Sequence, residues 1–321
     1  MLGFDQPRST DHAWGPRLLV FVEPQQVNDV LREIDAHLPP EFRGWPVRFY
    51  SWQTNTVRHH VDVVTLDAWA TAQLGVDPLA NELTVPHWLA LPQQKLLQMT
   101  AGEMFHDDLG ELRRLRQMLA WYPDDVRLWA MASQWHLIGN AEPRIGRTLE
   151  AGDARGSALI VARITRLLME LSFLQERRYW PYEKWFGTAF SRLEIAPRLG
   201  PHLDAMLAAC DAADRIAAVH AALRVLADQH NSLGVTSRVE PVIAAFQVGI
   251  NEAVRPYRVM NAGAFVDACK AAIKDDALRR LVTVGTFDQL THGDDALTNF
   301  TPWPQRMAAI YRDFLFHPET L

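Results

Sequence analysis

The sequence predicts an α+β protein, with a small N-terminal α/β domain followed by a larger, all-helical C-terminal domain. Its 321 residues are enough for about two domains. Up to about residue 70, apolar residues alternate with polar ones or form short runs between turn formers, which is typical of strands. From Asp67 onward, apolar residues recur with the helical period. We therefore expect one domain over residues 1–110 and a helical one over residues 111–321.

The first domain is expected to contain strands and one helix. Residues 15–24 (GPRLLVFVEP) predict a buried strand, and residues 47–52 and 60–66 predict two more. Residues 25–38 predict a helix between the first two strands, because their apolar side chains fall on one face ahead of a Pro-Pro stop. The order strand, helix, strand, strand indicates a small α/β unit.

The second domain is expected to be a set of packed helices. Residues 158–174 and 211–230 both place apolar side chains on one face, with charged side chains interleaved. Helix start signals occur at Pro123, which precedes two aspartates, and at Asp153. An acidic side chain at such a position can accept the free N–H groups of the first helical turn.

The composition excludes several classes of protein. The chain has 32 Lys and Arg against 38 Asp and Glu, which gives a formal net charge of -6. A protein that binds duplex DNA in general has an excess of positive charge, so we do not expect this class. It has no run of about 18 uncharged apolar residues and no signal peptide, so we expect neither membrane insertion nor secretion. The two cysteines, Cys210 and Cys269, cannot form a disulfide framework, which agrees with a cytoplasmic location.

The candidate catalytic residues are two aspartates associated with the predicted strands. Asp11 lies in STDHAWGPR (9–17), which runs into the first strand, and Asp62 lies within the third. A charge on a strand among apolar neighbours is costly unless it is paired or bound to a metal, and carboxylates are ligands that Mg²⁺ prefers. An alternative stays open, in which Asp11 caps a turn and Asp62 forms a salt bridge with Arg48 or Arg58.

Blocks of sequence spread over nearly the whole chain share the pattern of one family. These blocks are LGFD (2–5), STDHAWGPRLLVFV (9–22), and residues 100–135, 146–157, 177–190, 230–234 and 284–289. Together they resemble the family of domain of unknown function 4037. In its first domain, that family resembles the nucleotidyltransferase superfamily, which includes the aminoglycoside and lincosamide nucleotidyltransferases.

The resemblance implies a nucleotidyltransferase-like first domain and a Mg²⁺-dependent reaction. By resemblance, Asp11 matches the first carboxylate of a three-carboxylate metal site and Asp62 matches the third. Such a site transfers a nucleoside monophosphate from a nucleoside triphosphate (NTP) to a hydroxyl of a small molecule or protein. Metal ions held by the carboxylates neutralise charge on the phosphates, and the third carboxylate positions the acceptor hydroxyl. Arg17, just after Asp11, is a candidate phosphate contact.

The sequence departs from the superfamily pattern in two places. Ala13 stands where the second carboxylate is expected, and an alanine cannot bind a metal. The Gly-Ser pair that grips the terminal phosphates would fall before Met1, so we expect an N-terminally incomplete domain or one without this grip. These departures leave open an alternative, a catalytically degenerate nucleotide- or partner-binding protein on the same fold. A structural interaction protein with a Trp-rich helical surface is a third interpretation.

A second candidate surface combines cations with aromatic residues in the helical domain. Arg177, Arg178 and Lys184 lie among aromatic residues that include Trp180 and Trp185. Arginines can bind phosphate oxygens bidentately, a lysine supplies a point charge, and an exposed aromatic ring can stack on a base. The alternative is that the tryptophans belong to the core and that the charges lie on a solvated face.

Weaker polar candidates complete the sequence survey. The pairs His230-Asn231 and Asp288-Gln289 are candidates for lining the acceptor pocket. The glycine-containing stretch 146–157 opens a helix, for which we favour an ordinary capped start over an anion site. The sequence has no Cys/His zinc spacing and no hydrolase nucleophile elbow.

Overall fold

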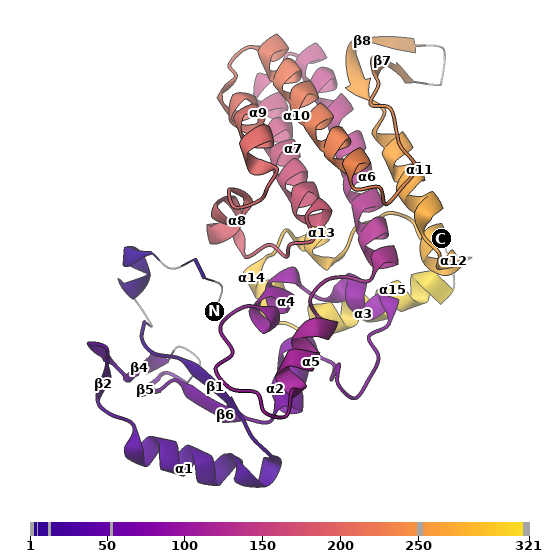
Figure 1. Cartoon of the computed structure of the whole chain (residues 1–321). Coiled ribbons are helices and arrows are strands. Elements are labelled where there is room, and N and C mark those ends of the chain that lie inside the picture. The colour runs from indigo at the N-terminus through magenta and orange to yellow at the C-terminus, as the bar shows by residue number, and fades with distance from the viewer. Residues whose placement is uncertain (1–2, 5, 12–13, 52–53, 249–252, 317–321) are drawn as a thin grey trace. The chain divides into compact units, whose positions relative to one another are not determined.

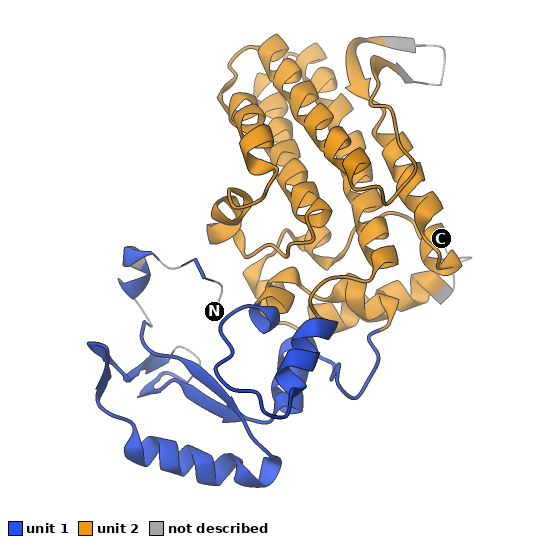
Figure 2. Cartoon of the chain, in the orientation of Figure 1, with its two compact units in different colours: residues 1–83, 98–118 blue, residues 84–97, 119–321 orange. Residues whose placement is uncertain are grey.

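The chain folds into a mixture of helices and short strands, and most of it is helical (Figure 1). This computed structural model describes residues 3–4, 6–11, 14–51, 54–248 and 253–316. The α+β fold class is confirmed. The chain divides into two compact units, the first made of residues 1–83 and 98–118 and the second of residues 84–97 and 119–321 (Figure 2).

A parallel pair of strands forms the centre of the first unit. β1 (Leu18–Phe21) pairs with β6 (Val61–Val64), and α1 (Val27–His37) lies between them in sequence and packs against β6. Strand, helix and strand form a small α/β unit here, but residues 48–51 of the second predicted strand pair outside this sheet. Two antiparallel ribbons accompany it, formed by β2 (Glu41–Phe42) with β3 (Trp45–Pro46) and by β4 (Arg48–Ser51) with β5 (Thr56–His59).

The expected burial of the first strand was wrong. Leu18 and Leu19 of β1 are 43% and 41% exposed, and α1 has no buried residue. In the described part of this unit the parallel sheet has two strands. A sheet this narrow cannot cover both faces of its own strands, so an apolar run that would be central in a wide sheet stays half in solvent.

The remaining helices of the first unit are short. They are η1 (Pro7–Asp11), η2 (Pro24–Gln26), α2 (Leu66–Leu74) and α5 (Glu111–Met118). α2 begins where the Thr65 hydroxyl accepts the Ala68 N–H at 3.3 Å, and it ends at Gly75, whose φ of 75° is readily available to glycine. α4 (Gln93–Thr100) contains the boundary between the two units in sequence.

Long helices lying side by side form the second unit (Figure 1). They are α6 (Asp124–Glu150), α7 (Ala154–Gln175), α9 (Ala196–Ala208), α10 (Ala212–Ser232) and α11 (Ala262–Ala272). The predicted starts of α6 and α7 are confirmed, and the Asp153 carboxylate accepts the Gly156 N–H at 2.7 Å. Trp129 and Trp135 of α6 are fully buried, and the Trp135 ring stacks on Phe265 of α11 at 4.5 Å.

The second unit is not all-helical, so the prediction of an all-helical C-terminal domain was wrong. β7 (Ile243–Val248) and β8 (Ala253–Met260) form an antiparallel hairpin, in a stretch rich in β-branched and aromatic residues. Its shorter helices are α3 (Val85–Ala90), α8 (Glu183–Phe190), α12 (Asp276–Arg280), α13 (Phe287–Thr291), α14 (Asp295–Asn299) and α15 (Trp303–Phe316). Among the described residues, no helix is both long enough and apolar enough to cross a membrane.

Candidate functional site

The predicted carboxylate Asp62 lies on β6, directly opposite Leu19 of the parallel partner strand. Its side chain is 46% exposed, and its Oδ1 accepts a hydrogen bond from Arg58 Nη2 at 2.8 Å. Arg48, the other salt-bridge partner considered from the sequence, pairs with Asp35 at 2.6 Å instead. Asp62 is therefore within reach of solvent and of a ligand, and its resting partner is a guanidinium.

Arg17, the predicted phosphate contact, lies immediately before β1 and within electrostatic reach of Asp62. Its guanidinium carbon is 5.2 Å from the centre of the Phe49 ring. Burial lowers the pKa of Arg17, while the charge of Asp62 raises it and that of Arg58 lowers it further. The structure thus places Arg17 within electrostatic reach of Asp62 and Arg58, and the role of Arg17 as a phosphate contact stays a prediction.

His60 packs into the same cluster through its ring. It stacks on Phe49 with ring centres 3.8 Å apart and an angle of 9°, and its Nε2 lies 3.1 Å from the Phe49 carbonyl oxygen. Burial lowers the pKa of His60; the bond to Phe49 raises it, and the charges of Arg17 and Arg58 lower it. Among the described side chains, this cluster joins the guanidiniums of Arg17 and Arg58 with the carboxylate of Asp62.

The other half of the predicted metal site lies outside what the structure describes. Asp11 ends η1, but its side chain is not among the described groups, and neither His12 nor Ala13 is a described residue. Among the described residues, no three His, Cys, Asp or Glu side chains form a metal-binding group. Asp62 alone supplies one oxygen ligand, which is the lower limit of what Mg²⁺ uses when substrate phosphates complete its coordination.

The aromatic and basic stretch of the helical unit has buried rings and solvated charges. Trp180 is 2% exposed and Trp185 is 8% exposed, so both belong to the core. Arg177 and Arg178 are exposed, and Arg177 donates to a carboxylate of α6 at 2.9 Å. The ammonium of Lys184 lies 4.9 Å from the centre of the Trp185 ring. This is the alternative arrangement left open by the sequence, and the role of the three cations in phosphate binding stays a prediction.

A buried polar network crosses the helical unit at α6, α7 and α13. The side chain of Glu170 is fully buried and accepts hydrogen bonds from Gln134 Nε2 and from Arg166 Nε, both at 2.9 Å. Gln289 Nε2 donates to the carbonyl of Ala130 at 2.9 Å and also to Gln134. These bonds satisfy buried polar groups within the protein, as a structural network does.

Two polar residues singled out in the sequence are also buried in this unit. Asp288 accepts the Gln93 N–H at 2.7 Å, and burial raises its pKa to about 7, opposed by this hydrogen bond. His230 receives the Trp135 indole N–H at 3.2 Å on Nδ1, and burial lowers its pKa to about 4. Both side chains are enclosed and bonded to the interior, which is the geometry of core polar groups rather than of an exposed acceptor pocket.

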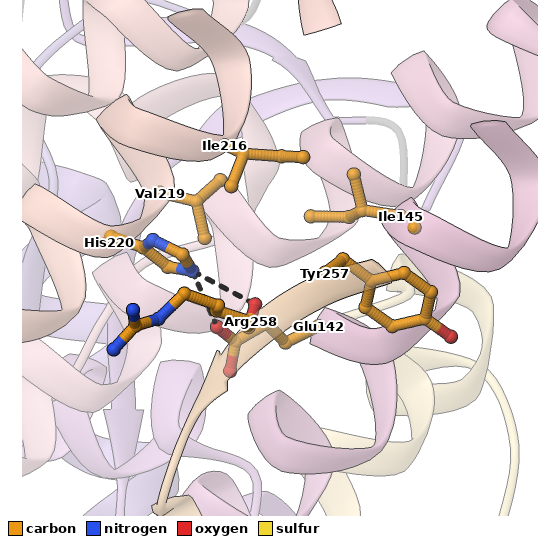
Figure 3. Close-up of a pocket in the computed structure, with 8 residues that line it drawn as sticks. Glu142, Ile145, Ile216, Val219, His220, Tyr257 and Arg258 are labelled. Carbon is orange, nitrogen blue, oxygen red and sulfur yellow. Dashed lines mark hydrogen bonds and ion pairs between the residues drawn. The ribbon is translucent and has the colours of Figure 1, made fainter. Parts of the chain in front are cut away.

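The sequence survey missed a pocket between α6, α10 and β8 (Figure 3). The carboxylate of Glu142 is buried there, 3.4 Å from His220 Nε2, and it accepts the Met260 N–H at 3.1 Å. Burial raises the pKa of Glu142, and the bonds to His220 and Met260 oppose that shift. The sequence feature that could have indicated this pocket is the carboxylate of Glu142 on the apolar face of α6, between the buried Ile138 and Ile145.

Comparison with known proteins adds one finding. Residues 88–186 match the family model described as Domain of unknown function (DUF4037). The match supports that family. It begins at residue 88, so it includes the aromatic and basic stretch and most of the buried polar network but neither Asp62 nor Arg17. Neither the curated proteins nor the solved structures gave a match.

Proposed function

We propose that the first unit binds an NTP as a catalytically degenerate member of the nucleotidyltransferase-like superfamily, in the cytoplasm. The observation that carries this proposal is the cluster in which Asp62 of β6 is held by Arg58 of β5, with Arg17, just before β1, in electrostatic reach of both. Two guanidiniums around a solvent-accessible site attract phosphates. With Ala13 in place of the second carboxylate, one of the three expected metal ligands is missing, which favours binding of the nucleotide over metal-assisted transfer.

A second candidate function is transfer itself, in which a nucleoside monophosphate moves to a hydroxyl of a small molecule or protein. The exposure of Asp62 favours it, because an exposed salt bridge such as that with Arg58 stabilises by about 0–1 kcal/mol and is readily given up. Asp62 and Asp11 would hold Mg²⁺, which would neutralise charge on the triphosphate. Asp62 would also position the acceptor hydroxyl.

Calorimetric titration of the full chain with ATP, GTP, CTP and UTP, with and without Mg²⁺, tests the binding proposal. We expect saturable binding of at least one nucleotide, and a stronger dependence on Mg²⁺ in the wild type than in Asp62→Asn. Asp29→Asn is the matched control, because Asp29 also forms an exposed ion pair in this unit but lies on α1. The absence of binding by all four nucleotides in both conditions would exclude both candidate functions.

Label transfer separates the binder from the enzyme. The full chain is incubated with the nucleotide that binds, labelled at the α-phosphorus, together with the small-molecule and protein fractions of a cell extract. The degenerate binder transfers no label, whereas an enzyme transfers it and loses that activity in Asp62→Asn. Ala13→Asp restores a carboxylate at the position of the missing ligand, so we expect it to raise the affinity for Mg²⁺ with bound nucleotide.

A further inference from the structure

The pocket of the second unit places a buried carboxylate beside a small space (Figure 3). The carboxylate belongs to Glu142 of α6, whose side chain is only 3% exposed. Its ion-pair partner is the imidazole of His220 on α10, which is charged only when it is protonated. The guanidinium of Arg258 on β8 extends away from Glu142 and donates to the Ile243 carbonyl (Figure 3). A buried carboxylate is costly without a fixed positive charge, so this one favours a cationic ligand.

The polar side of the pocket has more acceptors than donors. His220 Nε2 lies 3.4 Å from Glu142 Oε1 and 3.2 Å from the Arg258 carbonyl oxygen. Both neighbours accept hydrogen bonds, so Nε2 carries a hydrogen and donates it. The Met260 N–H is shared by both oxygens of Glu142, each at 3.1 Å. Since a carboxylate alone can accept about four hydrogen bonds, this side suits a ligand that donates several.

The rest of the pocket is apolar and narrow. Its other side is lined by three aliphatic side chains, Ile145, Ile216 and Val219 (Figure 3). The Tyr257 ring lies against Gly146, where no Cβ would fit. The interior admits a group about the size of one water molecule and is partly open to solvent. A primary ammonium group has about this size, whereas a guanidinium or a quaternary ammonium is larger.

We propose that this pocket binds the terminal ammonium group of a primary aliphatic amine. The ammonium has three N–H donors and a positive charge, which match the acceptors and the carboxylate of Glu142. Its alkyl chain lies against the aliphatic side of the pocket. This inference does not depend on the proposed function, because every residue of the pocket lies in the second unit.

Methyl NMR of the full chain, labelled at the isoleucine δ1 methyl groups, tests the proposal with n-propylammonium chloride. The resonances of Ile145 and Ile216 should shift and saturate, whereas that of Ile138, which is buried on α6 but does not line the pocket, should stay in place. Ile145→Val and Ile216→Val assign the two resonances, and potassium chloride at the same ionic strength is the salt control. The absence of a saturable shift with propylammonium overturns the proposal.

Three other small molecules test the charge and the size of the ligand. Propan-1-ol resembles propylammonium but has no charge, so it should bind about tenfold more weakly. Methylguanidinium and tetramethylammonium keep the charge on a larger head group, and they should also bind about tenfold more weakly because they exceed the space beside Glu142. Binding of any of the three as tight as that of propylammonium overturns the assignment to a primary ammonium.

Two variants place the binding at the pocket. Glu142→Gln removes the charge but keeps an oxygen for the Met260 N–H, and it should weaken propylammonium binding about tenfold. Glu150→Gln is the matched control, because Glu150 is another carboxylate of α6, paired with Arg255 at 3.2 Å outside the pocket, and the affinity should change less than about twofold.

Ile216→Trp keeps the proposal testable if Glu142→Gln does not fold. Ile216 is partly exposed, so a larger side chain there fills the pocket from its rim and leaves the Glu142 carboxylate in place. The propylammonium-dependent shift of Ile145 should then disappear, and circular dichroism checks the fold of each variant. Unchanged affinity in a folded Glu142→Gln or Ile216→Trp variant contradicts the proposed site.

The ammonium group could belong to a free amine or to a lysine side chain of a partner protein. Nα-acetyl-lysine amide has the same ammonium group on a peptide-like backbone. Binding of this compound as tight as that of propylammonium supports the site and assigns it to a lysine side chain. Weaker binding than that of propylammonium supports the site and assigns it to a free small amine.

Discussion

Two carboxylate and arginine pairs, one in each unit, have nearly the same bond and very different surroundings. Asp62 and Arg58 of the first unit are 2.8 Å apart with side chains 46% and 31% exposed. Glu170 and Arg166 of the second unit are 2.9 Å apart, and there the carboxylate is fully buried. The exposed pair can exchange its partners with solvent or a ligand. The buried pair is fixed by neighbours on several helices, which makes it part of the architecture.

This difference indicates which of the two ion pairs can bind a ligand. Burial makes a charge expensive to leave unpaired, so a buried ion pair is bonded on all sides and has little left to offer a ligand. An exposed pair contributes about 0–1 kcal/mol to stability and can be broken by a competing anion. The matched family segment includes the buried pair, whereas the chemistry that we propose depends on the exposed one.

Glu170→Ala provides the largest expected effect. It removes the buried carboxylate that accepts from Arg166 Nε and from Gln134 Nε2, so the free energy of unfolding should fall by about 3–5 kcal/mol. Urea denaturation monitored by circular dichroism measures it. Glu183→Ala is the control, because Glu183 contacts the same Arg166 at 3.0 Å but its side chain is 69% exposed, and its loss should cost less than about 1 kcal/mol. Equal losses in both variants would contradict the distinction between buried and exposed pairs.

Asp288 provides a pH test of the buried network. Its carboxyl has a pKa of about 7 in the folded state against an ordinary value of 3.8, because burial disfavours the charged form. The folded state therefore binds this proton more tightly than the unfolded state. The contribution of the Asp288 carboxyl to the free energy of unfolding is therefore full below pH 3.8 and is lost as the pH rises through about 7.

Asp288→Asn keeps an oxygen for the Gln93 N–H and cannot ionise. The stability of the wild type relative to this variant should fall as the pH rises across that window, as measured by urea denaturation at a series of pH values. Asp294→Asn at the exposed start of α14 is the control and should show no such fall over the same interval. A constant difference between the wild type and Asp288→Asn would contradict the raised pKa of the buried carboxyl.

Whether a feature of the fold or the site could be predicted depends on how far apart in the sequence its interacting residues lie. The separate strands and helix of the α/β unit, the start of α7 at Asp153 and the pairing of Asp62 with Arg58 depend on residues close together in the sequence, so local patterns could indicate them. The pairing of β1 with β6 does not, because it joins Leu18 to Val61. The Glu142 pocket depends on a bond to Met260, which is 118 residues away. Helical periodicity says which face is buried but not which distant residue packs against it. The exposure of Leu19 likewise depends on the width of the finished sheet.

Gly146 tests the close packing of the second unit. A Cβ at this position would overlap the Tyr257 ring, so Gly146→Ala should destabilise the protein by about 1–3 kcal/mol as the hairpin moves away from α6. Gly187→Ala on α8 is the control, because no atom lies within 4 Å of its added Cβ and alanine favours a helix by about 0.5–1 kcal/mol over glycine. Thermal melting of both variants should therefore shift in opposite directions, and a lower melting temperature for both would contradict this account.

Asp62→Asn provides the smallest expected effect on stability and the most informative one. Because the pair with Arg58 is exposed, the free energy of unfolding should change by less than about 1 kcal/mol. Asp35→Asn, which removes the comparable exposed pair with Arg48, should behave alike in urea denaturation. The two variants should differ in nucleotide binding, whose dependence on Mg²⁺ weakens in Asp62→Asn and stays as in the wild type in Asp35→Asn. If Asp62→Asn lowers the free energy of unfolding by nearly as much as Glu170→Ala, the Asp62 carboxylate stabilises the fold in the way that Glu170 does. It would then be a structural group rather than a group that can bind a ligand.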